Sequence, residues 1–123
     1  MEAKKIISEL KILYPGKKIY VDDLLHTGEV ICELESRELN PQRSVYIAVI
    51  DKKITHYHRQ SQEVIEVIKG NLIINVEGRE HTITPGRSFT IMPGQIHFAQ
   101  GNSTWIKVTS IPGMSPEKHV LVE

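Results

Sequence analysis

Two histidines separated by one residue, His56 and His58, have the spacing in this chain that best suits metal chemistry. Residues i and i+2 of an extended segment face the same side, so both imidazoles could reach one ion. The polar run 59–62 is typical of a turn, and Glu63 then opens a second strand. This hairpin can return the Glu63 carboxylate to the cavity that both histidines face.

A third imidazole, His97, follows the turn signal Met92-Pro93-Gly94-Gln95. Three histidines and one carboxylate form a donor set suited to a divalent first-row transition metal, and we expect manganese, iron, zinc or nickel. A single histidine in a strand is more often a half-buried polar residue than a ligand. The order and spacing of the four residues together favour a metal site over that alternative.

The pattern resembles the two sequence motifs of the cupin superfamily, in particular its small single-domain members of the cupin-2 type. The residues that carry the resemblance are His56, His58, Glu63 and Gly70 for the first motif, and Gly86, Met92-Pro93-Gly94 and His97 for the second. The resemblance implies that the metal ligands are His56, His58, Glu63 and His97.

Three positions depart from the usual motifs. Ile50 stands where the first motif usually begins with glycine, Met92 where the second usually has proline, and Gly101 where it often has asparagine. None of the three is a ligand position. The departures bear on turn geometry and on a contact that the displaced Asn102 would otherwise make.

The rest of the chain predicts an all-β domain preceded by one short helix. Apolar residues recur at helical spacing over 2–13, and Tyr14-Pro15-Gly16 ends that helix. Short runs rich in β-branched residues, separated by turn signals, follow from residue 17 onward. We expect strands over 18–22, 29–33, 44–50, 63–68, 72–76, 80–84, 88–92, 96–100 and 104–110, with a further edge strand over 119–122. The cupin resemblance narrows this to a double-stranded β-helix, a jelly-roll barrel, with the ligands in its mouth.

Length and composition indicate one domain, 1–123, made of a helix and turn (1–16) and a barrel (17–123), because 123 residues leave little room for a second module. The formal net charge is zero, so no overall field favours nucleic acid or an anionic membrane as a partner. No apolar run reaches the length of a membrane span, and the first residues lack the apolar segment of a signal peptide, so we expect a cytoplasmic protein. A single cysteine, Cys32, excludes an intramolecular disulfide.

Strand parity predicts which residues line the pocket. His56 and His58 facing inward place Ile54 inward and Tyr57 outward, and His97 facing inward places Ala99 inward and Phe98 outward. On the strand that Glu63 opens, Ile65 and Val67 would also face inward and Glu66 outward. Five residues are candidates for polar contacts at the mouth, although each type is more often a surface or core residue: Tyr46, Arg59, Gln95, Trp105 and Lys107.

Two functional hypotheses follow, and a third keeps the histidines as ordinary core residues. The first is a metal-dependent enzyme acting on a small oxygen-bearing organic molecule, with dioxygenase-like or carbohydrate isomerase-like chemistry, as the cupin resemblance implies. The second is a noncatalytic module that holds a small ligand in the same pocket. No second carboxylate or base is marked as catalytic by its spacing. We also expect a homodimer, because the N-terminal segment or the 119–122 strand could pair with a neighbour's sheet.

Overall fold

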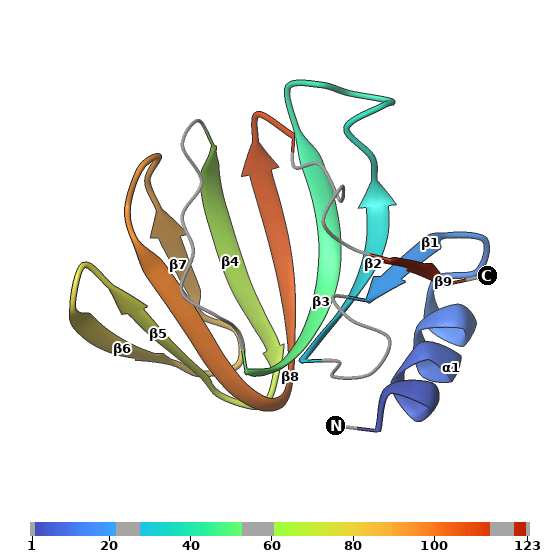
Figure 1. Ribbon diagram of the computed structural model, residues 1–123, viewed down its shortest axis with the longest axis horizontal. Coiled ribbons are helices and arrows are strands. Elements are labelled where there is room, and N and C mark those ends of the chain that lie inside the picture. Colours follow the sequence, from blue (N-terminus) through green and yellow to red (C-terminus); the bar gives the residue numbers. More distant parts are fainter. Residues whose placement is uncertain (1, 22–27, 53–60, 114–119, 123) are drawn as a thin grey trace.

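The computed structural model describes residues 2–21, 28–52, 61–113 and 120–122, and it confirms an all-β fold with one N-terminal helix (Figure 1). All strand pairs are antiparallel, and the curved sheet wraps around its own inner face in the manner of a jelly roll. The elements are α1 (Ala3–Leu13), β1 (Lys18–Val21), β2 (Glu29–Glu35), β3 (Ser44–Lys52), β4 (Gln62–Lys69), β5 (Leu72–Val76), β6 (Arg79–Ile83), β7 (Ser88–Ile91), β8 (His97–Ile111) and β9 (Val120–Val122).

The strand β8 joins the two halves of the sheet. Its first residues, 97–100, pair with β5. On one side β8 pairs with β3 at Gln100 and again from Thr104 onward, and on the other side it pairs with β4 from Trp105 onward. The sequence predicted two strands here, 96–100 and 104–110, and that prediction was wrong: one strand of 15 residues runs through both. The chain bends sharply without leaving the sheet, because Ser103 takes a φ of 50° and its N–H donates to Asp51 Oδ1 at 2.7 Å.

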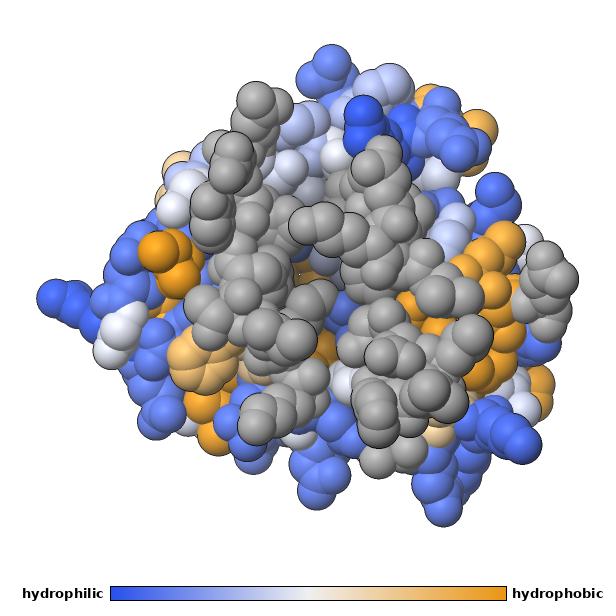
Figure 2. Space-filling model, in the orientation of Figure 1, coloured by the Kyte–Doolittle hydropathy of each residue, from blue (hydrophilic) through white to orange (hydrophobic). Residues whose placement is uncertain are grey.

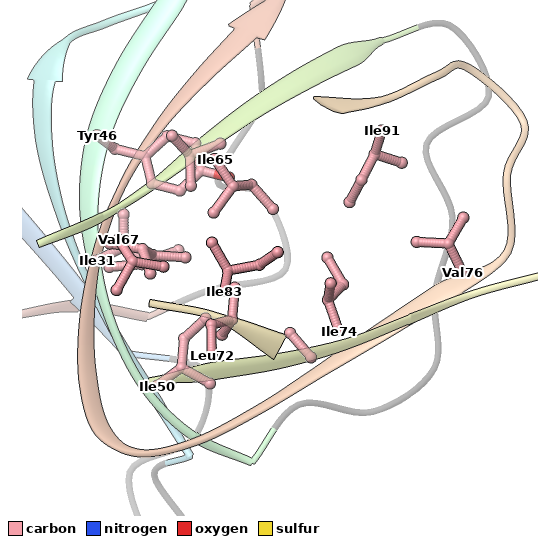
Figure 3. Close-up of a cluster of buried hydrophobic side chains, with 14 residues drawn as sticks. Ile31, Tyr46, Ile50, Ile65, Val67, Leu72, Ile74, Val76, Ile83 and Ile91 are labelled. Atoms are coloured by element: carbon pink, nitrogen blue, oxygen red, sulfur yellow. The ribbon is translucent and has the colours of Figure 1, made fainter. Parts of the chain in front are cut away.

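The inner face of the sheet carries the larger hydrophobic cluster, which Figure 3 shows between strands on opposite sides of the roll. The members of this cluster recur at every second residue along a strand, because alternate residues of a pleated strand face the same side. Members include Ile31 on β2, Ala48 on β3, Ile65 on β4 and Ile74 on β5. This cluster lines the inner face of the roll, the face to which the sequence assigned the predicted ligands.

The outer face of β1, β2 and β3 carries a second cluster, which α1 covers. Ile6 and Leu10 lie one helical turn apart on the buried side of α1, and the Leu10 side chain is fully buried. Trp105 packs in the same outer cluster, so the helix and the tryptophan together seal this face. The one helix predicted from the sequence therefore has a structural role here, as a cover for the sheet.

The hairpin between β5 and β6 turns at Glu77-Gly78, and β6 begins at Arg79, one residue before the strand expected over 80–84. Val76 pairs with Arg79, which leaves a two-residue loop in which Glu77 has φ 51° and Gly78 has φ 81°. Two successive positive φ angles are typical of a type I′ turn, whose twist matches that of the flanking strands.

The C-terminal strand β9 confirms the edge strand predicted over 119–122 at its described residues, Val120–Val122. It pairs with β1 and ends the strand order on that side among the described residues. Leu121 on this strand is 43% exposed. A homodimer formed through such an edge stays a prediction.

On the face shown in Figure 2, the described residues form hydrophilic areas with smaller hydrophobic patches between them. No helix among the described residues is long and apolar enough to cross a membrane.

The thiol of Cys32 lies in the outer cluster and has no exposed surface. Burial raises its pKa to about 11, with the charge of Glu33 adding to the increase and that of Lys17 opposing it. Because the thiolate is the reactive form, we expect the folded protein at pH 8 to react with a thiol reagent at least about 100-fold more slowly than the protein unfolded in guanidinium. A thiol titration followed by absorbance measures both rates, and equal rates would contradict this burial.

Candidate metal centre

Glu63 and His97 meet on the inner face of the roll. Glu63 lies at the start of β4, opposite Ile91 of β7 and Ser110 of β8, and His97 is the first residue of β8. Their side chains are almost fully buried, with 4% and 3% of each residue exposed, and Glu63 Oε1 lies 3.6 Å from His97 Nε2. Two residues 34 positions apart in the sequence thus present a carboxylate oxygen and an imidazole nitrogen to the same point.

The orientation of the His97 ring is set by the turn that precedes it. His97 Nδ1 lies 3.1 Å from the carbonyl oxygen of Gln95, and a carbonyl only accepts, so Nδ1 carries the hydrogen. The side-chain oxygen of Gln95 accepts a hydrogen bond from the Met92 N–H at 2.9 Å, which closes the turn. The other ring nitrogen, Nε2, faces Glu63. In the neutral ring Nε2 carries no hydrogen, so it turns a lone pair toward the carboxylate. Gln95 thus acts through its backbone and by holding the turn.

Tyr46 approaches the same carboxylate from β3. Its hydroxyl donates to Glu63 Oε2 at 3.1 Å, and the tyrosine is 7% exposed. Burial raises the pKa of the Tyr46 phenol well above its usual value, and the charges of Glu63 and Glu29 and the hydrogen bond to Glu63 raise it further. The phenol therefore stays protonated and remains a hydrogen-bond donor at pH values near neutral.

A second buried carboxylate, Glu29, was missed by the sequence analysis. Glu29 is 3% exposed, pairs with Ile50 across the β2–β3 ladder, and shares strand parity with Ile31 of the inner cluster. The signal was available in the sequence, because Glu29 and Ile31 are two residues apart in a β-rich segment. Its charge contributes to the raised pKa of Tyr46, so the inner face is more polar than its sequence indicated.

The other predicted site residues divide into two groups. His56, His58 and Arg59 lie outside the described residues, so the structure brings together two of the four predicted ligands. Within the described ranges, no three histidine, cysteine or acidic side chains converge in a way that could hold an ion. Trp105 belongs to the outer cluster under α1 and Lys107 is exposed, so neither lines the pocket.

The strand parity predicted for the pocket wall holds wherever it can be seen. Ala99 is buried in the inner cluster, while Phe98 is half-buried and lies outside that cluster. On β4, Ile65 and Val67 are buried with Glu63, whereas Glu66 is exposed. Ile54 and Tyr57 lie outside the described residues. The inner wall near Glu63 and His97 is thus mainly hydrocarbon, as Figure 3 shows around Ile65, Ile74 and Ile91.

Comparison with protein families decides the classification. The family described as the cupin domain matches residues 43–104, half of the chain, and this segment contains Tyr46, Glu63 and His97. The chain belongs to the cupin family. No curated protein sequence matches this cupin at a significant level.

Solved structures of other cupins share the fold. An RmlC-like cupin from Shewanella frigidimarina has a TM-score of 0.68 at 21% identity, covering 85% of this chain and 90% of its own. Ectoine synthase from P. lautus has a TM-score of 0.67 at 17% identity, with coverages of 83% and 81%. The Streptomyces protein Pac13, a nucleoside dehydratase also solved with uridine, has a TM-score of 0.65 at 13% identity, with coverages of 78% and 79%. At these identities the similarity shows the shared fold and leaves the reaction open.

Proposed function

We propose that this cupin is a metal-dependent enzyme that acts on a small oxygen-bearing organic molecule, by dioxygenase-like or isomerase-like chemistry, where Glu63 and His97 meet. The observation that carries the proposal is the 3.6 Å separation between Glu63 Oε1 and His97 Nε2 at two almost fully buried residues. His56 and His58 complete the proposed donor set.

The two described residues fit a divalent ion. With Nδ1 hydrogen-bonded to Gln95, the lone pair of a neutral His97 ring faces a carboxylate oxygen, and two electron-rich atoms repel unless a cation lies between them. Atoms that each lie about 2.1 Å from one ion are at most about 4.2 Å apart, so a separation of 3.6 Å allows both to contact it. A proton on Nε2 would also relieve the repulsion, which is the alternative that keeps His97 as an ordinary core residue.

The metal would supply a Lewis acid that polarises a substrate oxygen, or a template that holds substrate beside dioxygen. The protein's own residues prepare the site. The Gln95 carbonyl fixes the His97 ring, the Tyr46 hydroxyl supports Glu63, and the hydrocarbon wall excludes water, which strengthens every electrostatic contact inside.

A small ligand suits this site better than a polymer, because Glu63 and His97 are almost fully buried and the inner face carries hydrophobic side chains from both halves of the roll. The solved Pac13 structure with uridine shows that another protein of this fold holds a small molecule. The second candidate function is a noncatalytic binding module. It is favoured by the mainly apolar wall, since the described groups on the inner face that could serve acid–base chemistry beside His97 are few, namely Glu63, Tyr46 and Glu29.

The test is metal content followed by ligand binding. Untagged protein purified without added metal should carry close to one transition-metal ion per chain by elemental analysis. A thermal-shift screen of loaded protein against hydroxy acids, keto acids, diols and sugars should then find a stabilising bidentate ligand, worth about 2.7 kcal/mol when its concentration is 100 times its Kd. Failure to bind any of the four metals would overturn the metal site. A stabilising ligand without turnover would establish the binding module.

A further inference from the structure

Tyr46 reaches Glu63 across an intervening strand. Tyr46 lies opposite Val108, and Glu63 lies opposite Ser110, so β8 runs between the two strands that carry them. The Tyr46 ring packs in the inner cluster, where Figure 3 shows it beside Ile65. A ring held in this way gives its hydroxyl a fixed position.

The two oxygens of Glu63 face different groups. Oε2 accepts the hydrogen bond from Tyr46 at 3.1 Å, while Oε1 lies 3.6 Å from His97 Nε2. A carboxylate that binds an ion through both oxygens must turn both toward it, and the Tyr46 hydrogen bond holds one of them aside.

We propose that Tyr46 is a positioning residue that makes Glu63 bind a divalent ion through Oε1 alone, which keeps one coordination position available for an oxygen of the ligand. This rests on the metal site of the proposed function. It adds to that site a residue outside the four predicted ligands, and it explains how Glu63 can bind the ion and still leave room for a bidentate ligand.

The test replaces the hydroxyl and reads the ion directly. Cobalt(II) alone is titrated into metal-free wild type and Tyr46→Phe, with its visible absorption giving both affinity and coordination number. Partners that orient a metal ligand are typically worth 10–100-fold in affinity, so we expect Tyr46→Phe to bind about 10-fold more weakly, with an altered spectrum. Its affinity should not be restored by raising the protein's stability with an excluded osmolyte.

Tyr20→Phe is the matched control. Tyr20 is half-buried, packs against the same inner cluster, and has no hydrogen bond to Glu63 or His97 among the described residues. The Tyr20→Phe variant loses a hydroxyl that takes no part in this hydrogen bond, so its cobalt affinity and absorption spectrum should equal those of the wild type. Tyr46→Met, which also lacks the hydroxyl and can fill the space flexibly, should behave like Tyr46→Phe and serves if the phenylalanine variant does not fold.

The outcomes separate the two proposals. If wild type binds no cobalt, the metal site itself is wrong. If wild type binds and both Tyr46 variants keep its affinity and spectrum, the metal site stands and the positioning role is overturned. A variant that only lowers the melting temperature of the metal-free protein, with cobalt binding unchanged, overturns it equally, because Tyr46 would then be a packing residue.

Discussion

Replacing His97 with alanine is expected to reduce transition-metal affinity by more than about 100-fold, since it removes a donor itself, whereas loss of a partner of a donor costs about 10–100-fold. Glu63→Ala should have an effect of the same order. The reason is geometric: His97 Nε2 and Glu63 Oε1 lie 3.6 Å apart, close enough to bind one ion together, so removing either takes away one of the two donors that the structure brings together. Metal content after purification and a competitive chelator titration measure the loss.

Two control variants separate this effect from the general effect of removing any histidine or any acidic residue. His81 is half-buried on β6 with its ring centroid 4.8 Å from that of Phe89, and Glu66 is exposed on the opposite face of β4 from Glu63. His81→Ala and Glu66→Ala should therefore keep wild-type metal content. Full metal occupancy in both His97→Ala and Glu63→Ala would show that the ion binds elsewhere in the protein.

The inner face of the roll could be predicted from the sequence because it depends on a local rule. Strand residues alternate between faces, so once Glu63 and His97 are taken as inward, the inward positions of Val67 and Ala99 follow without knowledge of the partner strands. The two-residue turn at Glu77-Gly78 is equally local, since positive φ angles favour glycine and hairpin twist favours this turn.

The contacts that depend on which strands meet could not be predicted. The bond between Tyr46 and Glu63 joins residues 17 positions apart and requires β3 and β4 to flank β8. The sequence did not decide whether Trp105 contacts the pocket or belongs to the core. In the structure, it packs in the outer cluster that α1 covers. The continuity of β8 was missed because Gly101 and Ser103 resemble a strand end, and only the pairing with β3 shows that the strand bends and continues.

Gly101 is the residue at which sequence resemblance and structure give opposite expectations. Asparagine is common at this motif position, so a substitution based on the motif would be expected to be harmless. In the structure, a Cβ at Gly101 would lie 2.6 Å from Thr104 Cβ and 2.9 Å from the carbonyl oxygen of Ile50, closer than real Cβ atoms approach. Thr104 has little freedom to move, because it is 1% exposed and its hydroxyl donates to the Asn71 carbonyl at 2.8 Å.

We therefore expect Gly101→Ala to lower the free energy of unfolding by about 3 kcal/mol, and Gly101→Asn to lower it further, because overpacking at a fixed backbone forces strands apart. The shift in melting temperature should be roughly 10 °C. Gly113→Ala is the milder comparison: its Cβ would meet Arg37 Cβ at 3.0 Å, Cγ at 3.1 Å and backbone Cα at 3.3 Å, so a small shift of the Arg37 backbone relieves the contact and the cost should be about 1 kcal/mol. Denaturant unfolding measures all three variants. If Gly101→Asn unfolds at the wild-type denaturant concentration, then β3 and β8 can move apart at this bend at little cost in free energy. The close approach of the two strands at Gly101 would then not be needed to hold His97 at the start of β8.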